Sequence, residues 1–272
     1  MAGPTVVYER KGRICIIRLN RPEKANSFSI EMLNELKTKL IEVQLDDKVR
    51  IIILTGTGAN FTTGMDVDTI KEYPPEESKT IAAKMERLGA ETVRILMGGK
   101  LSIAAINGRA MGMGVVYPLA CDFRYAVEDA VFKMPEIDAS IYPAANCITL
   151  MTQQIGAMKT KEILMTCKKY TAKEFKEIGI LNDVYPRDCL MEEITALAKN
   201  LSRKNKDLLR FLKVNINQVS YLDSFEAGSK LEGDAFHYYK HDDKEKYLEK
   251  LVKKYGIDSS VLRSNLDQDL KD

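Results

Sequence analysis

Histidine is nearly absent from this chain, and its scarcity excludes the commonest forms of nucleophilic catalysis. The sequence holds two histidines, His237 and His241, and both fall in a predicted helical tail. A Ser-His-Asp or Cys-His nucleophile would need a histidine brought from that tail to the rest of the fold. Asp234 could share a helix face with them, but HExxH is missing and the pattern is typical of an exposed polar face. We expect no metal site, so proton transfer must depend on carboxylates, lysines or backbone dipoles.

An excess of charge and long apolar runs are also missing. The chain has 41 Lys and Arg against 39 Asp and Glu, a net charge of +2, which argues against a nucleic-acid partner. The longest apolar runs, such as 51–54, are far too short for a bilayer, so no membrane association is expected. The first twelve residues lack a basic segment followed by an apolar core, which predicts no signal peptide. The five cysteines form no CxxC pair and are expected as buried thiols of a soluble cytoplasmic protein.

Short apolar runs alternate with helical patterns over the first half of the chain. The predicted order is a hairpin around 11–12, a helix over about 29–44 with Ser29 as its N-cap, a strand over 49–56, a helix over about 76–97, a strand over 101–106, and short strands from Phe123 and from Val131. The continuous apolar runs are typical of strands covered on both faces, as in parallel sheets. The alternation of strands with helices predicts an α/β fold.

Beyond about Met158 the strand signal fades, and roughly the last hundred residues are predicted to be all-helical. Two apolar stripes support this prediction: Leu190, Ile194, Leu197 and Leu201, and then Leu208, Leu212, Ile216 and Val219. We therefore predict an α/β core over 1–190 and a helical C-terminal region over 191–272.

Two glycine-bearing turns directly follow predicted buried strands. The first is FTTGMDV at 61–67, and the second is NGRAMGMG at 107–114, which precedes a helical stretch. Glycine allows the backbone to approach a ligand closely, and a helix N-terminus presents free amides with a partial positive charge. If the two turns converge, they form an oxyanion hole of the kind that stabilises a thioester enolate. The second turn lacks GxGxxG and GK[ST], which argues against a dinucleotide or phosphate loop.

A lone glutamate, Glu136, follows proline in the otherwise apolar stretch FKMPEI at 132–137. One interpretation is a solvated residue at the end of a strand. The other is a carboxylate held against apolar walls, where its affinity for protons rises and it becomes a usable base.

Together these segments resemble the crotonase, or enoyl-CoA hydratase/isomerase, superfamily. The matching segments are LNRPEKANSFS (19–29), ILTGTGANFTTGMDV (53–67), AAINGRAMGMG (104–114) with ACDFRYA (120–126), FKMPEI (132–137) with YPAA (142–145), and YTAKEFKEIGILNDVYP (170–186). The resemblance implies a spiral of ββα units, with C-terminal helices that assemble homotrimers, often paired as hexamers. It also implies an acyl-CoA thioester substrate, with coenzyme A entering as part of the substrate and no separate cofactor.

The resemblance assigns roles to individual residues. The backbone amides of Met65 and Met113 would form the oxyanion hole, and Glu136 would be the catalytic acid/base. Methionine replaces a usual glycine at position 113, so its side chain must point away from the thioester. The expected coenzyme A groove comprises Lys24, Thr63, Gly64, Asp66, Val67 and Asp68.

Departures from the family pattern favour one subclass. Hydratases of the family use a second glutamate, which here is Val116, and a glycine near the water, which here is Ala144. A single glutamate beside an oxyanion hole fits an enoyl-CoA double-bond isomerase better; the dienoyl-CoA isomerase variant is disfavoured because it too would want acids at these positions. On an extended segment Asp138 would share a face with Glu136. Asp138 is then either a second acid or a structural residue, and Asp122 is interpreted as structural.

Other functions remain open on the same scaffold. They are an enoyl-CoA or cyclic dienoyl-CoA hydratase that uses Asp138, a decarboxylase, a CoA-thioester or ring hydrolase, and, from another class, an acyl-CoA-binding homologue without turnover. The residues do not indicate the length, branching or ring character of the acyl group.

Overall fold

The parallel part of the fold is a six-stranded sheet in the order β1-β2-β3-β5-β7-β10. The structure is a computed structural model that describes residues 3–71, 73–220 and 225–240. The strands are β1 (Val6–Lys11), β2 (Ile14–Leu19), β3 (Ile51–Gly56), β5 (Leu101–Ile106), β7 (Phe123–Val127) and β10 (Asp183–Tyr185). β1 and β2 form the predicted antiparallel hairpin, and the other neighbours pair in parallel. All of β3 is buried, which confirms the prediction of a strand covered on both faces.

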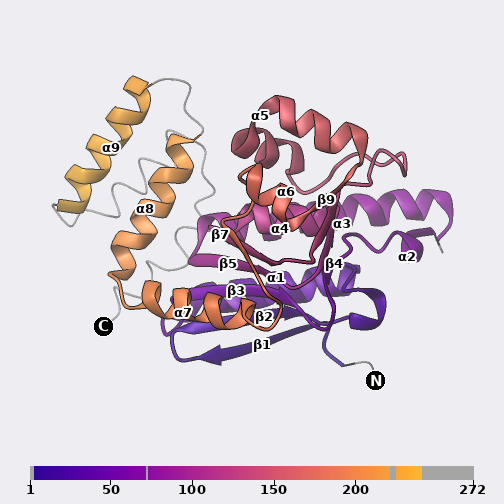
Figure 1. The fold of residues 1–272 in the computed structure, drawn as a ribbon, viewed down its shortest axis with the longest axis horizontal. Helices are drawn as coiled ribbons and strands as arrows, with labels where there is room; N and C mark the ends of the chain where they lie inside the picture. Colours follow the sequence, from indigo (N-terminus) through magenta and orange to yellow (C-terminus); the bar gives the residue numbers. More distant parts are fainter. Residues whose placement is uncertain (1–2, 72, 221–224, 241–272) are drawn as a thin grey trace.

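A second, four-stranded sheet carries the turns that follow these strands. Its order is β4 (Asn60–Thr62), β6 (Arg109–Met111), β8 (Val131–Lys133) and β9 (Lys169–Thr171). Along the chain β4 follows β3, β6 follows β5 and β8 follows β7, and a helix follows each pair. This repeat of strand, strand and helix is the predicted spiral of ββα units, and it brings the ends of three successive units side by side (Figure 1).

The helices lie around the two sheets, and α8 and α9 lie side by side at one end of the molecule (Figure 1). They are α1 (Ile30–Leu45), α2 (Val67–Lys71), α3 (Pro75–Gly98), α4 (Met113–Ala120), α5 (Cys147–Thr166), α6 (Ala172–Glu177), α7 (Leu190–Ser202), α8 (Lys206–Val219) and α9 (Phe225–Lys240), with a short 3-10 helix at Pro22–Lys24. Ser29 caps α1 as predicted, because its side chain accepts a hydrogen bond from the Met32 amide. In the described part of the chain, no helix has both the length and the apolar composition of a membrane span.

One sequence prediction about strands is wrong. The last hundred residues are not all-helical, because β10 at 183–185 pairs in parallel with β7. A strand of three residues is too short to give an alternating pattern, and it is positioned by pairing with the edge of the sheet. The predicted short strand from Val131 is confirmed as β8, which ends at Lys133, so Glu136 lies on a turn beyond it.

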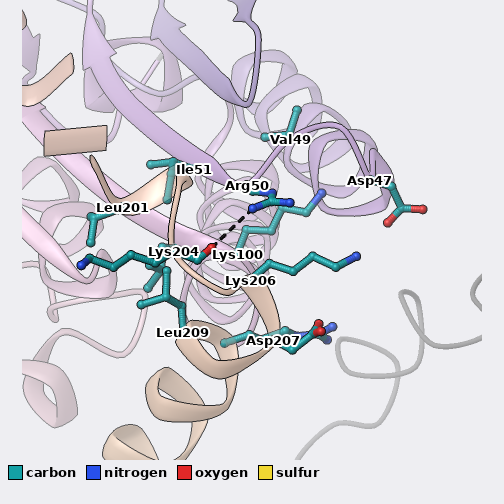
Figure 2. Close-up of a pocket in the computed structure, with 12 residues that line it drawn as sticks. Asp47, Val49, Arg50, Ile51, Lys100, Leu201, Lys204, Lys206, Asp207 and Leu209 are labelled. Atoms are coloured by element: carbon teal, nitrogen blue, oxygen red, sulfur yellow. Dashed lines mark hydrogen bonds between the residues drawn. The ribbon is translucent and has the colours of Figure 1, made fainter. Parts of the chain in front are cut away.

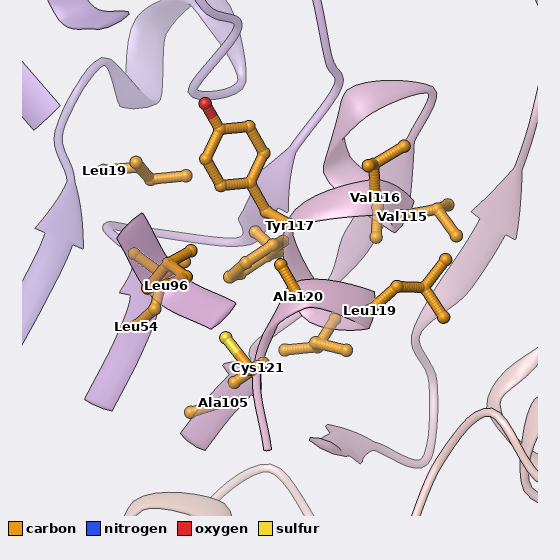
Figure 3. Close-up of a cluster of buried hydrophobic side chains, with 14 of the residues drawn as sticks. Leu19, Leu54, Leu96, Ala105, Val115, Val116, Tyr117, Leu119, Ala120 and Cys121 are labelled. Atoms are coloured by element: carbon orange, nitrogen blue, oxygen red, sulfur yellow. The ribbon is translucent and has the colours of Figure 1, made fainter. Parts of the chain in front are cut away.

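α4 is buried over its whole length and forms the centre of the core. Figure 3 shows Val115, Val116, Tyr117 and Leu119 extending from this helix into a cluster of apolar side chains. The ring of Tyr117 stacks on Phe28, with 4.8 Å between ring centroids. Four of the five free cysteines are buried, as expected from the sequence. Any backbone group at the N-terminus of α4 is therefore held by close packing on all sides.

A buried ion pair attaches α8 to this core. The Lys213 side chain is 1% exposed, and its ammonium group donates to Asp122 at 2.9 Å and to the carbonyls of Leu96 and Lys100 at 2.7 and 3.0 Å. The Asp122 carboxylate also accepts from the Ser102 amide, which supports its structural interpretation. The predicted stripe on α8 lies away from the core, since Leu212 and Ile216 are 48% and 65% exposed.

Replacing Lys213 with alanine should lower the free energy of unfolding by about 3 kcal/mol or more, because Asp122 would keep a largely buried and unpaired charge. Lys206 lies exposed on the same helix, and Lys206→Ala should change the free energy by less than about 0.5 kcal/mol. Urea denaturation measures both variants. Equal stabilities for the two would show that the ion pair does not hold α8 in place.

Candidate active site

Two asparagines, the buried Asn26 and the half-buried Asn107, bond to the segment just before the first glycine-bearing turn. The backbone carbonyl of Asn60 accepts hydrogen bonds from the side chain of Asn26 at 2.8 Å and from that of Asn107 at 3.3 Å. At Gly108 a β-carbon would lie 1.9 Å from the carbonyl oxygen of Ala59, so the second turn touches the backbone that leads into the first. The sequence analysis did not single out either asparagine, although both stand within the matched segments just before a turn. Their role is to hold the two turns together.

The Met65 amide hydrogen is available to a ligand because of the way its segment is paired. Phe28 and Met65 form an isolated parallel bridge, in which the Phe28 amide donates to Gly64 at 2.7 Å and the Asp66 amide donates to Phe28 at 2.9 Å. Met65 stands between Gly64 and Asp66, the two residues that bond to Phe28, so in this parallel bridge its own amide points away from Phe28. Among the residues that the structure describes, no protein acceptor is recorded for the Met65 amide.

The Met113 amide lies directly beside this segment. Met113 is the first residue of α4, and an amide in the first helical turn has no partner within the helix. A β-carbon at Gly64 would lie 2.5 Å from the Met111 oxygen and 3.3 Å from the Met113 nitrogen, so only glycine permits this approach. Gly64 and Gly112 both have positive φ angles, +83° and +54°. The predicted convergence of the two turns is therefore present in the structure.

The Glu136 carboxyl group lies at the same place. A β-carbon at Gly112 would be 2.8 Å from its Oε1 atom, and its Oε2 atom is buried without a hydrogen-bond partner among the described residues. Burial raises the pKa of Glu136, and a hydrogen bond from its own backbone opposes this only in part. Of the two interpretations, the carboxylate held against apolar walls matches this environment.

The acidic residue next to Glu136 lies elsewhere. Asp138 was expected on an extended segment that shares a face with Glu136. This is wrong because residues 135–141 form a turn, in which the Ala139 amide donates a hydrogen bond to the Pro135 carbonyl and the Ile141 amide donates one to the Glu136 carbonyl. The Asp138 side chain is 57% exposed and pairs with Lys133 at 2.7 Å. The Lys133 ammonium holds the pKa of Asp138 below its ordinary value.

Neither position 116 nor position 144 supplies a second acid. Val116 lies one turn into α4 and is 1% exposed, within the apolar cluster of Figure 3. Ala144 carries no polar side chain, and its carbonyl accepts the Cys147 amide at 3.1 Å. Glu136 is thus the carboxylate that the described residues bring to the two amides.

The residues expected to bind coenzyme A lie in two neighbouring stretches, the turn at Lys24 and the segment 63–68, and they range from exposed to buried. The Thr63 amide donates to Ala25, which places Thr63 against the turn that carries the exposed Lys24. Val67 is half-buried at the start of α2, and Asp68 is exposed beside Lys71. Gly64 is buried by its contact with the second turn.

Asp66 belongs to this segment but is committed to the protein. Burial acts to raise its pKa, but hydrogen bonds from Thr69 and the Arg21 guanidinium, 3.1 Å away, hold the pKa below its ordinary value. Its carboxylate therefore fixes the position of the segment and is an unsuitable direct ligand for a phosphate.

A cavity of about 80 Å³ lies at the opposite edge of the large sheet, and Figure 2 shows its lining residues. Arg50 and Lys100 line it just before β3 and β5, whereas the candidate site lies at the carboxyl ends of these strands, where open α/β sheets bind ligands. Both cations are held by backbone carbonyls, Arg50 by Ser202 at 3.1 Å and Lys100 by Val43 at 2.9 Å.

Across residues 3–71, 73–220 and 225–240, no group of three potential ligands could hold a metal ion. The side chains of the two histidines lie outside the described structure.

Comparisons with known proteins place the chain in a family. The sequence profile of the enoyl-CoA hydratase/isomerase family matches residues 9–256. The chain is 34% identical to the putative enoyl-CoA hydratase/isomerase YngF of Bacillus subtilis, over 79% of this chain and 83% of that protein. It is 29% identical to the crotonyl-CoA hydratase of Syntrophomonas wolfei, over 87% and 90%. The crystal structure of an enoyl-CoA hydratase from Bacillus anthracis superposes with a TM-score of 0.80 at 29% identity, over 92% of this chain and 96% of that one.

Replacing Glu136 with glutamine should make the folded protein more stable at neutral pH. A carboxyl group with a raised pKa lowers stability as the pH rises through its titration, because the folded state resists loss of the proton. The neutral amide removes this effect, so the two melting temperatures should differ at pH 7.5 and converge below the ordinary glutamate pKa of about 4.5. The same change at the exposed Glu177 is the control. A Glu136→Gln protein less stable than wild type at pH 7.5 would contradict the burial of an unpaired charge.

Proposed function

Because the chain belongs to the enoyl-CoA hydratase/isomerase family, we propose that it binds enoyl-CoA thioesters and shifts their double bond between the 3,4 and 2,3 positions. The observation that carries this proposal is the half-buried carboxyl group of Glu136, whose Oε2 atom is buried without a partner, beside two backbone amides, with no second acid next to it among the described residues. A double-bond shift needs one group that takes a proton and returns it, whereas the family's usual hydration uses two glutamates. The alkyl side chain of Val116 stands where the second would be.

The proposed mechanism follows from the positions of these groups. The thioester oxygen accepts hydrogen bonds from the Met65 and Met113 amides, and the N-terminal end of α4 favours negative charge there. Glu136 removes a proton from C2 of a 3-enoyl-CoA, and the electron pair delocalises over the dienolate to that oxygen. The electrons then return through the chain, C4 takes the proton from Glu136, and the double bond comes to lie between C2 and C3.

The backbone amide donors and the acid/base Glu136 are expected to contribute different amounts to the rate enhancement. Each amide donor lowers the barrier by about 3 kcal/mol, as in other oxyanion holes. A correctly placed acid/base adds roughly two to four powers of ten in rate. The apolar surroundings of Glu136 bring its proton affinity closer to what the transfer needs.

The coenzyme A part of the substrate is proposed to lie along the two neighbouring stretches described above, which include Lys24, Thr63, Gly64, Val67 and Asp68. Lys24 is exposed and suits a phosphate group, and the turn backbone suits the adenine. No separate cofactor is proposed. A cytoplasmic location stays a prediction.

Hydration is the second candidate function, and the names of the relatives favour it. Besides the protein from Syntrophomonas wolfei, the chain is 28% identical to the short-chain-enoyl-CoA hydratase of Clostridium acetobutylicum. In this chain Glu136 would have to activate water alone, because Asp138 is paired with Lys133 on the surface.

A paired assay separates the two reactions. Purified protein is given a 3-enoyl-CoA and, separately, crotonyl-CoA, and the absorbance of the conjugated thioester is followed. We expect the band to appear from the first substrate and to persist with the second, and Glu136→Gln should slow the first reaction by about 10²- to 10⁴-fold. The exposed Glu177→Gln should leave the rate unchanged. Loss of the band from crotonyl-CoA would establish hydration and overturn the isomerase assignment.

We also propose that the region over 191–272 assembles homotrimers, or dimers of trimers. The exposed apolar stripe Leu208, Leu212 and Ile216 on α8 supports this, because a large exposed apolar surface is a typical sign of a subunit contact.

The double substitution Leu212→Asp with Ile216→Asp should convert the trimer or hexamer to monomers, because it would bury charges in the proposed contact. Size-exclusion chromatography with light scattering measures the mass. Lys204→Ala, a change at an exposed polar position before α8, is the control and should leave the mass unchanged. A monomeric wild-type protein would rule out the assembly.

A further inference from the structure

The side chain of Met113 is buried, and Met113 directly follows Gly112, the residue that lies against Glu136. Met113 is 3% exposed, and its terminal methyl lies against α3, where a β-carbon added to Gly89 would be 2.4 Å away. The β-carbon added to Gly89 would also lie 3.3 Å from the β-carbon of Ala145. The helix α3, the start of α4 and the loop before α5 therefore meet near this methyl group. The main chain of Met113 thus faces the proposed oxyanion hole, while its side chain fills a gap between helices.

The three helices that carry or flank this site are rich in buried apolar side chains. They include Met85, Leu88, Val116, Leu150 and Met151 on α3, α4 and α5, each at most 5% exposed. Cys147, the first residue of α5, lies close enough to Glu136 for its charge to act on the thiol, because burial and then the charge of Glu136 raise the pKa of Cys147 to about 12. Glu136, which lies against Gly112, and the thioether of Met113 are therefore both near the start of α4.

In the proposed pose, the acyl carbons beyond the reacting ones continue past Glu136 toward this thioether. With the carbonyl oxygen on the Met65 and Met113 amides and C2 to C4 next to Glu136, the rest of the chain continues toward the residues that bound the thioether. We infer that Met113 is a specificity-determining residue that restricts the protein to short acyl groups, with Gly89 as the residue that makes room for its side chain. The inference rests on the proposed function and adds the substrate class to it.

The two residues depend on each other. A larger residue than glycine at position 89 would collide with the thioether, and a smaller residue than methionine at position 113 would leave an apolar void beside Glu136. Such a void takes up apolar ligands, so a longer acyl chain would gain the contacts that the thioether now makes.

The experiment compares the binding of butyryl-CoA, decanoyl-CoA and free CoA by titration calorimetry. Saturated thioesters are not turned over by an isomerase or a hydratase, so binding is measured apart from the reaction. Wild type should bind butyryl-CoA at least about tenfold more tightly than decanoyl-CoA, and Met113→Ala should reduce or reverse this ratio by about tenfold or more. Binding of free CoA, which has no acyl group, should stay the same.

Two further variants control for loss of packing. Leu40→Ala removes an equally buried side chain near the far end of α1 and should leave the chain-length ratio unchanged. Gly89→Ala creates no void; it pushes the thioether toward the substrate and should weaken butyryl-CoA several-fold while free CoA binds as before.

The outcomes distinguish this inference from the function on which it rests. Wild-type protein that binds the two acyl-CoAs equally, or a ratio unaffected by Met113→Ala and Gly89→Ala, overturns the role of Met113 and leaves the proposed function standing. Wild-type protein that binds none of the three ligands overturns the proposed function, and the inference with it.

Discussion

The close contact between Gly64 and the backbone of residues 111–113 is the constraint on which the site depends. It brings two amides from different ββα units to one place, and it tolerates no side chain at Gly64. The asparagine side chains at 26 and 107 hold the turns in register through one shared carbonyl. The buried α4 then fixes the second amide from behind, so the donors are oriented before any ligand arrives.

The same contact explains why a weakly polar site can be effective. Glu136 lies against Gly112, one residue from the second amide, and its Oε2 atom is buried without a partner among the described residues. Burial makes its charge less stable and its proton affinity higher, while in the proposed reaction the amides would stabilise negative charge on the other side of the reacting carbons. Proton affinity and oxyanion stabilisation are thus set by separate parts of the fold. The enzyme needs neither histidine nor metal in this proposal.

Sequence reasoning was most successful where one short segment carries its own signal. The strands at 51–56 and 101–106 are buried on both faces, so their apolar runs were clear, and Ser29 was identifiable as a cap. β10 was missed because three residues carry no period and the strand depends on the edge of β7. Asp138 was misplaced because backbone hydrogen bonds within 135–141, not alternation, set its direction. The inward position of Lys213 likewise depends on Asp122, which is distant in the sequence.

Position 113 has a consequence for how such a site can diversify. The amide and the side chain of Met113 point to different places. Every replacement except proline keeps the backbone amide donor, whereas every replacement changes the side chain that fills the gap between the helices. If the inference about Met113 holds, mutation at this codon changes which acyl groups fit while the proposed chemistry is retained. Sites whose donors are side chains lack this freedom, because there each change of shape also changes the catalyst.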